Sequence, residues 1–260
     1  MKSDVPPEIP ASSAPHATSA IRLADPLIEL VDVTKTYLSG EIDVEVLHGV
    51  SLKIYPGEFL AIMGASGSGK TTLMNILGCL DIPTQGSYLL GGEDVSTMSE
   101  KDLAVVRNKR IGFVFQQFNL LSSMTAQRNV ELPLMYAGVH AKERHTLARE
   151  ALERVGLGDR THHRPGELSG GQQQRVAVAR ALVTEPALIL ADEPTGNLDS
   201  TSTADVLDLF DGLHDAGRTV VLITHEQDVA ARAGRVVRLR DGLVTDDSAL
   251  GAVAGSGVRS

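Results

Sequence analysis

Short apolar runs alternate with longer amphipathic stretches along most of the chain. The runs at 187–192 (ALILAD) and 218–224 (RTVVLIT) have the length and composition of strands that are buried on both faces. Longer stretches with helical spacing lie between such runs, among them 70–80 and 202–217. The alternation predicts an α/β fold, in which a mostly parallel sheet is flanked by helices.

Three segments depart from this alternation. Two strand-like segments near the start, 27–33 and 44–54, predict an N-terminal antiparallel β part. Residues 117–165 contain helical patterns and no convincing strand, which indicates an inserted helical subdomain. The segment 235–245 predicts a closing hairpin with an Asp-Gly turn.

The two ends of the chain lack periodicity and are rich in small and polar residues. We therefore expect disordered tails at 1–26 and 247–260, on either side of one domain at 27–246. No apolar run approaches the length of a membrane span, and the first twenty residues lack the apolar core of a secretion signal. These features favour a location in the cytoplasm.

The formal net charge of −9 limits the partners that the chain can attract. Nonspecific binding of nucleic acid needs a basic face, so no nucleic-acid partner is expected. Electrostatic docking on anionic lipid is disfavoured for the same reason. If the chain works at a membrane, another protein has to hold it there.

The stretch GASGSGKTT at 64–72 carries the clearest chemistry. It matches G-x-x-x-x-G-K-[ST], and a predicted strand precedes it while a predicted helix follows it, as a phosphate-binding loop requires. A bare glycine turn is the alternative, and this context disfavours it. The expected nucleotide-binding residues are Gly64, Ala65, Ser66, Gly67, Ser68, Gly69, Lys70, Thr71 and Thr72.

Two carboxylates follow the most apolar strand. Asp192 and Glu193 lie at its carboxyl end, the edge where ligands bind in open α/β sheets. Asp192 and the Thr71 hydroxyl are candidate ligands of Mg²⁺, and Glu193 is the candidate that polarises an attacking water. His225 and Gln116 also end predicted strands. His225 is either a donor to the γ-phosphate or a core histidine, and Gln116 is either a metal or water ligand or a surface amide.

A second glycine pair opens another predicted helix. Ser169 and Gln172 form a capping-box pattern, and Gly170 and Gly171 leave the backbone N–H groups of the helix terminus open. Such a terminus can bind an anion, but the first loop already surrounds the phosphates of its own nucleotide. The terminus is therefore expected to face a nucleotide held by another subunit, the alternative being an ordinary capped helix.

The chain resembles the ATP-binding-cassette (ABC) family in six motifs, which occur in the family's order and spacing: GASGSGKTT, Gln116, LSGGQQQR, ILADEP, NLDS and His225. The resemblance spans about Leu27 to Thr245. It implies a P-loop ATPase core, ATP and Mg²⁺ as cofactors, and a head-to-tail homodimer with two nucleotides at its interface. It further implies that Ser169, Gly170, Gly171 and Gln172 bind the γ-phosphate in trans, that Asp199 lies near the partner's loop, and that Tyr37 stacks on adenine. A surface tyrosine at a strand end is the alternative for Tyr37.

Within the family, the chain is similar to the macrolide-exporter and lipoprotein-release (MacB/LolD-like) subfamily. That likeness implies an ATPase of a transporter, bound at the cytoplasmic face of the membrane to a separately encoded permease of the MacB/FtsX-like kind. It implies export or extraction of a macrolide, peptide or lipoprotein-like substrate, with Gln116 as a hinge to the helical subdomain. The alternatives are a soluble ABC ATPase that acts on ribosomes or DNA and a cell-division ATPase.

Overall fold

The computed structural model describes residues 25–39 and 42–249, and the remainder of both predicted tails lies outside the described residues. Its larger sheet has six strands in the order β10-β9-β3-β8-β7-β6. All neighbours in it run parallel except β10, which is antiparallel to β9. The predicted α/β class with a mostly parallel sheet is confirmed. The strands are β3 (Phe59–Met63), β6 (Ile111–Phe115), β7 (Leu188–Asp192), β8 (Thr219–Thr224), β9 (Arg235–Arg240) and β10 (Leu243–Asp247).

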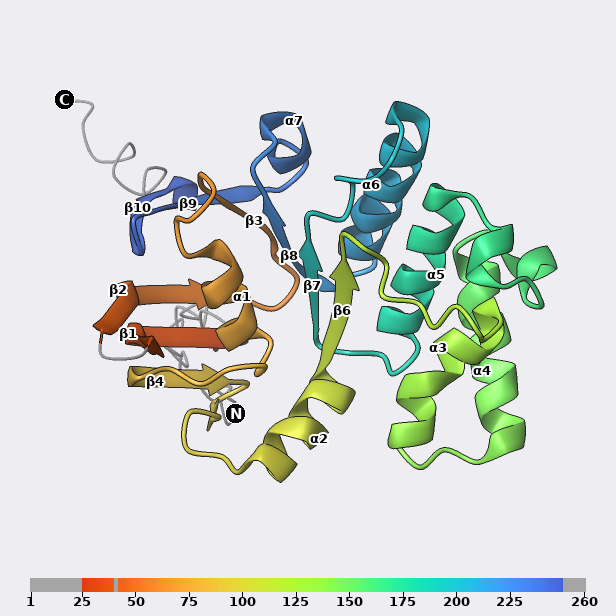
Figure 1. Ribbon diagram of the computed structural model, residues 1–260, viewed down its shortest axis with the longest axis horizontal. Helices are drawn as coiled ribbons and strands as arrows, with labels where there is room; N and C mark the ends of the chain where they lie inside the picture. Colours follow the sequence, from red (N-terminus) through yellow and green to blue (C-terminus); the bar gives the residue numbers. More distant parts are fainter. Residues whose placement is uncertain (1–24, 40–41, 250–260) are drawn as a thin grey trace, which may run out of the picture.

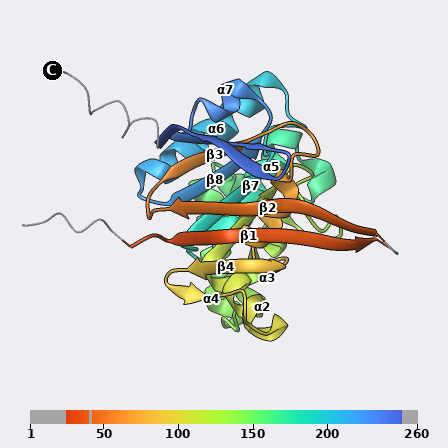
Figure 2. The same cartoon turned by 90° about the vertical axis from the view of Figure 1, so that its left-hand side faces the viewer.

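The N-terminal part forms a second, antiparallel sheet in the order β2-β1-β4-β5, as Figure 2 shows for its three long strands. Its hairpin of β1 and β2 matches the predicted antiparallel β part. The sheet also recruits two strands from a later region for which the sequence patterns gave no prediction. The bounds are β1 (Ile28–Ser39), β2 (Ile42–Ile54), β4 (Gln85–Leu90) and β5 (Glu93–Asp94).

The large sheet separates the two main clusters of the hydrophobic core. Helix α1 lies between the two sheets, where Leu73 and Leu77 belong to one buried cluster with Leu30 of the small sheet and Ile62 of the large one (Figure 1). The opposite face of the large sheet is covered by α5 and α6, with α3 and α4 outside α5. The helices are α1 (Lys70–Leu77), α2 (Glu100–Arg110), α3 (Ala126–Tyr136), α4 (Ala141–Arg154), α5 (Gly170–Leu182), α6 (Ser200–Asp215) and α7 (Gln227–Ala230), with short 3-10 turns at Gly158–Arg160 and Pro165–Glu167.

The C-terminal boundary differs from the expected one. Asp247, assigned to the tail from the sequence, is the last residue of β10 and is buried. Its carboxylate accepts hydrogen bonds from Arg235 Nε and Nη2 at 2.9 and 2.6 Å, and Arg235 also bonds Glu58 at 3.0 Å. The periodicity of the sequence does not reveal this pair, because its two partners are polar and twelve residues apart.

Asp247→Asn is expected to destabilise the fold by about 1–2 kcal/mol near neutral pH, because a half-buried guanidinium loses its charged acceptor. The bonds from Arg235 hold the pKa of Asp247 below its ordinary value, although burial opposes them. The stabilisation is therefore complete above the unfolded-state pKa of about 4 and is lost as the pH falls through the lower folded pKa. Urea denaturation at several pH values measures it, with the exposed neighbour Asp246→Asn as the control. Equal losses in the two variants would contradict the expectation.

Candidate functional site

The loop that joins β3 to α1 has a conformation that requires glycine. Gly67 and Gly69 have φ angles of 79° and 99°, in the left-handed region that side chains disfavour. At Gly64, a Cβ atom would collide with the backbone carbonyl of Leu239. The loop therefore curls tightly over the N-terminus of α1, and its backbone remains open to a close ligand.

Lys70 is the first residue of α1, and its side chain folds over this loop. The ammonium donates hydrogen bonds to the carbonyl oxygens of Gly64 and Ala65, both at 2.8 Å. The residue is only 9% exposed, so its charge lies inside the curl and beside the positive end of the helix dipole. Together these groups make a concentrated positive site of the kind that binds phosphate.

Asp192 ends β7 at the same edge of the sheet, between Phe115 of β6 and Ile223 of β8. Partial burial raises the pKa of its carboxyl, and the neighbouring charge of Glu193 raises it further, while Lys70 acts in the opposite direction. A half-buried carboxylate with a raised pKa is stabilised when a cation binds to it.

Glu193 has a left-handed backbone, with φ at 41°. Its N–H donates to the carbonyl of Ile223 at 2.8 Å, and its Oε1 lies 2.7 Å from Nδ1 of His225. The side chain of Glu193 is 26% exposed and that of His225 is 59% exposed, so both reach solvent in the pocket. A strained backbone next to a paired acid and imidazole is typical of functional sites.

One open pocket of about 650 Å³ unites these groups. The structure therefore brings Gln116, Asp192, Glu193 and His225 to the glycine loop, as the sequence predicted; their roles stay predictions. The pocket is lined by Val46, Ala65, Ser66, Gly67, Gly69, Lys70, Thr71, Thr72, Gln116, Asp192, Glu193 and His225.

A family model described as "ABC transporter" matches residues 47–196, more than half of the chain. The chain belongs to the ABC transporter family. Its matched span includes the glycine loop, Gln116, the glycine pair at the start of α5 and the two carboxylates at the end of β7. As a member of this family, the chain is an ATP-binding cassette and an ATP hydrolase.

Known relatives indicate the subfamily to which the chain belongs within the ABC transporter family. The Macrolide export ATP-binding/permease protein MacB of Hyphomonas neptunium is 57% identical over 226 residues, which are 87% of this chain and 35% of that protein. An uncharacterized ABC transporter ATP-binding protein of Thermotoga maritima is 56% identical over 229 residues, 88% of this chain and 98% of that protein. The chain thus spans about a third of the MacB relative and almost all of the Thermotoga one. These identities place it in the MacB/LolD-like subfamily.

A solved structure shows the same fold. It is the dimeric, post-hydrolysis state of the ATP-binding cassette MJ0796 bound to ADP and Pi, and it superposes with a TM-score of 0.78 at 44% identity. The match covers 85% of this chain and 97% of that one. A P-loop cassette fold is therefore confirmed for this ABC ATPase.

The glycine pair of the cassette lies at the N-terminus of α5, outside the pocket of its own chain. The predicted capping box is present: the Gln172 N–H donates to Ser169 Oγ at 3.2 Å, and the Ser169 N–H donates to Gln172 Oε1 at 3.0 Å. At Gly171, a Cβ atom would lie 2.6 Å from Ser202 Oγ, so glycine is needed for α5 to meet the start of α6. Asp199 caps α6 by accepting from the Ser202 N–H at 2.9 Å.

Tyr37 lies on β1 and does not contribute to the pocket lining itself. It is 37% exposed, and its hydroxyl donates to Asp81 Oδ2 at 2.9 Å. Burial raises the pKa of this phenol, the nearby Thr72 hydroxyl opposes the shift, and Asp81 adds to it. Because Thr72 lines the pocket, Tyr37 stands beside the phosphate-binding loop.

Two residues of the site, Val46 and Asn197, were not anticipated from the sequence. Val46 of β2 lines the pocket but is one of many apolar strand residues, so no local signal marks it. The Asn197 side chain donates to the carbonyl of Gln116 at 3.0 Å, which ties the loop after β6 to the loop after β7. The position of Asn197 in the NLDS motif is the sequence feature that could have predicted its place in the site.

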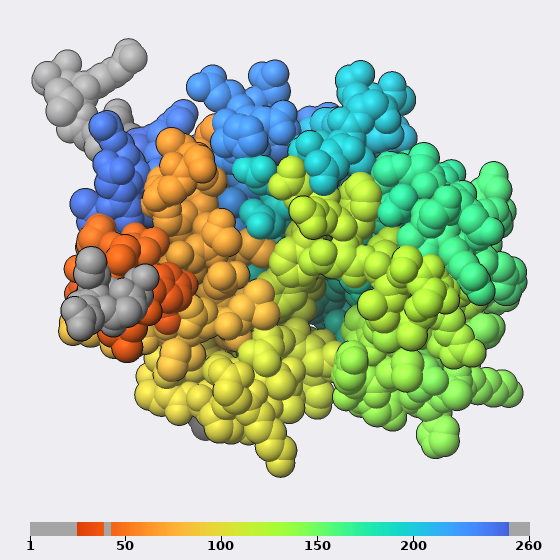
Figure 3. All heavy atoms as spheres, in the orientation of Figure 1, coloured from red at the N-terminus to blue at the C-terminus, as the bar shows by residue number. Residues whose placement is uncertain are grey.

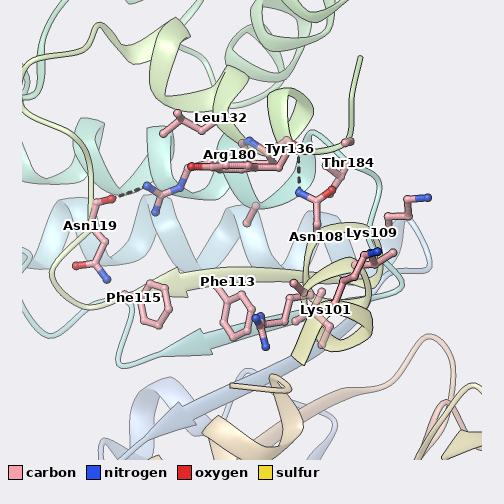
Figure 4. Close-up of a pocket in the computed structure, with 17 residues that line it drawn as sticks. Lys101, Asn108, Lys109, Phe113, Phe115, Asn119, Leu132, Tyr136, Arg180 and Thr184 are labelled. Atoms are coloured by element: carbon pink, nitrogen blue, oxygen red, sulfur yellow. Dashed lines mark hydrogen bonds between the residues drawn. The ribbon is translucent and has the colours of Figure 1, made fainter. Parts of the chain in front are cut away.

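A second, larger groove of about 960 Å³ lies between α2, β6, α3 and α5. Phe115, the residue before Gln116, is part of its lining. Figure 3 shows it as a hollow between α2 and the helical subdomain. In Figure 4, Phe113 and Phe115 lie side by side at its floor, with ring centroids 5.6 Å apart, and Arg180 reaches toward Asn119. Arg180 donates to the carbonyls of Phe118 at 2.9 Å and of Asn119 at 2.5 Å. The groove and the nucleotide pocket therefore share the loop that follows β6.

Proposed function

We propose that this chain is the nucleotide-binding subunit of an exporter or extraction machine, in which ATP binding closes a homodimer and ATP hydrolysis reopens it. The observation that carries the proposal is the division of the site. One chain places its P-loop, Asp192, Glu193 and His225 around a single pocket, while its own α5 terminus lies outside that pocket. A second copy in head-to-tail orientation supplies the missing terminus.

The pocket suits Mg²⁺, because hard cations prefer oxygen ligands and several side chains that line the pocket carry oxygen atoms. The Thr71 hydroxyl, the Asp192 carboxylate and the Gln116 amide oxygen would hold the ion, the carboxylate through water. The burial that raises the pKa of Asp192 also marks a carboxylate that gains from a nearby cation. When bound there, Mg²⁺ would supply positive charge against the phosphates of the nucleotide.

Hydrolysis then depends on how the attacking water and the γ-phosphate are positioned relative to each other. Lys70 and the N–H groups of the loop hold the phosphates in line. The Glu193 carboxylate accepts a hydrogen bond from a water beside the γ-phosphate and polarises that water for attack. His225 orients Glu193 through Nδ1, which leaves Nε2 to face the γ-phosphate.

In the dimer, Ser169, Gly170, Gly171 and Gln172 of one copy bind the γ-phosphate of the other, because the helix dipole of α5 favours negative charge at its start. Asp199, at the neighbouring start of α6, faces the partner's loop. Tyr37 stacks on the adenine.

A mixing experiment tests the shared site. Lys70→Ala removes the P-loop charge, and Gly170→Asp places a negative charge at the α5 terminus, where a Cβ atom has ordinary contacts. Each variant alone is expected to lack ATPase activity. A 1:1 mixture forms heterodimers with one intact composite site and recovers up to about a quarter of the wild-type rate.

Gly166→Asp is the matched control for this experiment, since it adds the same charge at an uncrowded position four residues earlier. It should keep wild-type activity alone. A mixture of Lys70→Ala with Gly170→Asp that stays inactive while both variants bind one another would rule out the shared site.

The transport partner is proposed to be a separately encoded membrane permease that docks in the groove between α2, β6, α3 and α5. None of the helices in the described ranges has the length and apolar character needed to cross a membrane. The groove has an apolar floor, Phe113 and Phe115, with Lys101, Arg107 and Lys109 among the residues that line it. It suits a short cytoplasmic helix with apolar and acidic side chains, and such docking holds the cassette at the cytoplasmic face of the membrane.

The direction of transport is proposed from the relatives. Besides MacB, a protein of Pseudomonas aeruginosa named as the Pyoverdine export ATP-binding/permease protein PvdT is 58% identical over 225 residues. We infer export or extraction of a macrolide, peptide or lipoprotein-like substrate. Purification of the tagged chain from its membranes tests this: a stoichiometric permease is expected, and a ribosome- or nucleic-acid-bound chain would contradict it.

A further inference from the structure

Three polar residues form a closed cluster beside the P-loop helix. Lys35 of β1 donates to Asp81 Oδ1 at 2.6 Å and to the carbonyl of Ile82 at 2.9 Å. The other oxygen of Asp81 accepts from the Tyr37 hydroxyl at 2.9 Å. The Lys35 ammonium also lies over the Tyr37 ring, 4.9 Å from its centroid. One carboxylate thus binds both partners at once.

Burial and further hydrogen bonds hold the Lys35 and Asp81 side chains in place. The side chains of Lys35 and Asp81 are 11% and 25% exposed, so this ion pair is screened less than a surface pair. Asp81 Oδ1 also accepts from the Ile82 N–H at 2.8 Å, and the Asp81 N–H donates to the Asn75 carbonyl at 3.2 Å. The carboxylate is therefore anchored to the end of α1, the helix whose first turn bears Lys70.

This arrangement restricts the Tyr37 ring. Its hydroxyl is fixed by Asp81, and one of its faces is covered by the Lys35 ammonium, a favourable cation–π contact. The residue remains 37% exposed, and a base would use the uncovered face. A ring that is held in place before binding loses less entropy when a base stacks on it.

We propose that Asp81, supported by Lys35, is a positioning residue for nucleotide binding, which holds Tyr37 in the orientation that stacks on the base. The inference rests on the proposed nucleotide site. Helix α1 then sets both ends of that site: its first turn holds the phosphates, and the carboxylate just after its last turn holds the stacking ring. Asp81 itself touches no part of the nucleotide.

Two substitutions isolate this role. Asp81→Asn keeps the size of the side chain but removes its charge, and Tyr37→Phe keeps the ring but removes the hydroxyl that Asp81 binds. The probes are ATP and inorganic tripolyphosphate, each with Mg²⁺ and the full chain in calorimetry. Tripolyphosphate has no base, so a general loss of structure weakens both probes, whereas a loosened ring weakens ATP alone.

Each variant is expected to weaken ATP binding about fivefold while tripolyphosphate binding stays unchanged, since only part of the stacking between the base and the ring is lost. The double variant is expected to be no weaker than either single one, because both remove the same bond. Asp43→Asn, an exposed carboxylate on β2, should behave as wild type.

Three results would overturn the positioning role alone: Asp81→Asn binding ATP as wild type does, equal weakening of both probes, or additive losses in the double variant. If Asp81→Asn does not fold, Tyr37→Phe decides by itself, and its unchanged ATP affinity overturns the role. If the wild-type chain binds neither probe, the proposed nucleotide site and this inference both fail.

Discussion

Glu193→Gln is expected to bind ATP normally, to hydrolyse it at least about a hundredfold more slowly, and to accumulate as a nucleotide-bound dimer. Glutamine can keep the hydrogen bond to His225, which joins Oε1 to Nδ1 at 2.7 Å, so the geometry survives. It cannot accept a proton from water. In the proposed cycle, ATP binding still closes the dimer of this variant, and the hydrolysis step that reopens it is absent.

Steady-state phosphate release and size-exclusion chromatography with ATP and Mg²⁺ measure the two effects. Glu226→Gln is the matched control, because it makes the same change at an exposed acid next to His225. It should turn over ATP as the wild type does and elute as the wild type. Hydrolysis at the wild-type rate in Glu193→Gln would remove this residue from the catalytic role.

Lys70→Ala is expected to raise the Kd for ATP about a hundredfold, or about 2.7 kcal/mol, because a buried ammonium that faces the phosphates is lost. The substitution should change the Tm of the nucleotide-free chain little. The ammonium bonds only two loop carbonyls among the described residues, and alanine favours the first turn of a helix.

Titration calorimetry with ATP and thermal unfolding without it separate these expectations. Lys53→Ala serves as the control, since it removes a lysine from β2 whose partner, Glu29, lies on the neighbouring strand. An unchanged ATP affinity in Lys70→Ala would exclude the glycine loop as the phosphate site. A large fall in Tm would instead show that Lys70 supports the fold.

The features that could be predicted from the sequence are those encoded in one continuous stretch of residues. The P-loop needs only a strand, three glycines and a helix in one run, and the capping box of α5 joins residues three positions apart. The buried strands β3, β7 and β8 were likewise evident from unbroken apolar runs. Their carboxyl ends meet at one edge of the sheet, so Asp192 and His225 were expected together.

Signals that depend on distant partners were missed. Helix α2 has a polar sequence with only two buried residues, Leu103 and Val106, so its periodicity is weak. The end of helix α1 was missed for a local reason instead: the helix was expected to run to residue 80 but ends at Leu77, where Gly78 serves as its C-cap and Cys79 turns left-handed. The bond between Lys35 and Asp81 spans 46 positions, a separation at which charge pairs have no sequence signature.

Arg180 can couple binding in the groove to binding in the nucleotide pocket, because it contacts the loop that the two sites share. It fixes the carbonyls of Phe118 and Asn119, two residues with left-handed backbones in the loop that begins at Gln116. If a segment of the proposed permease fills the groove and shifts this loop, it changes the affinity for ATP by some factor. Thermodynamic reciprocity then requires ATP to change the affinity for that segment by the same factor, so either ligand can report on the other.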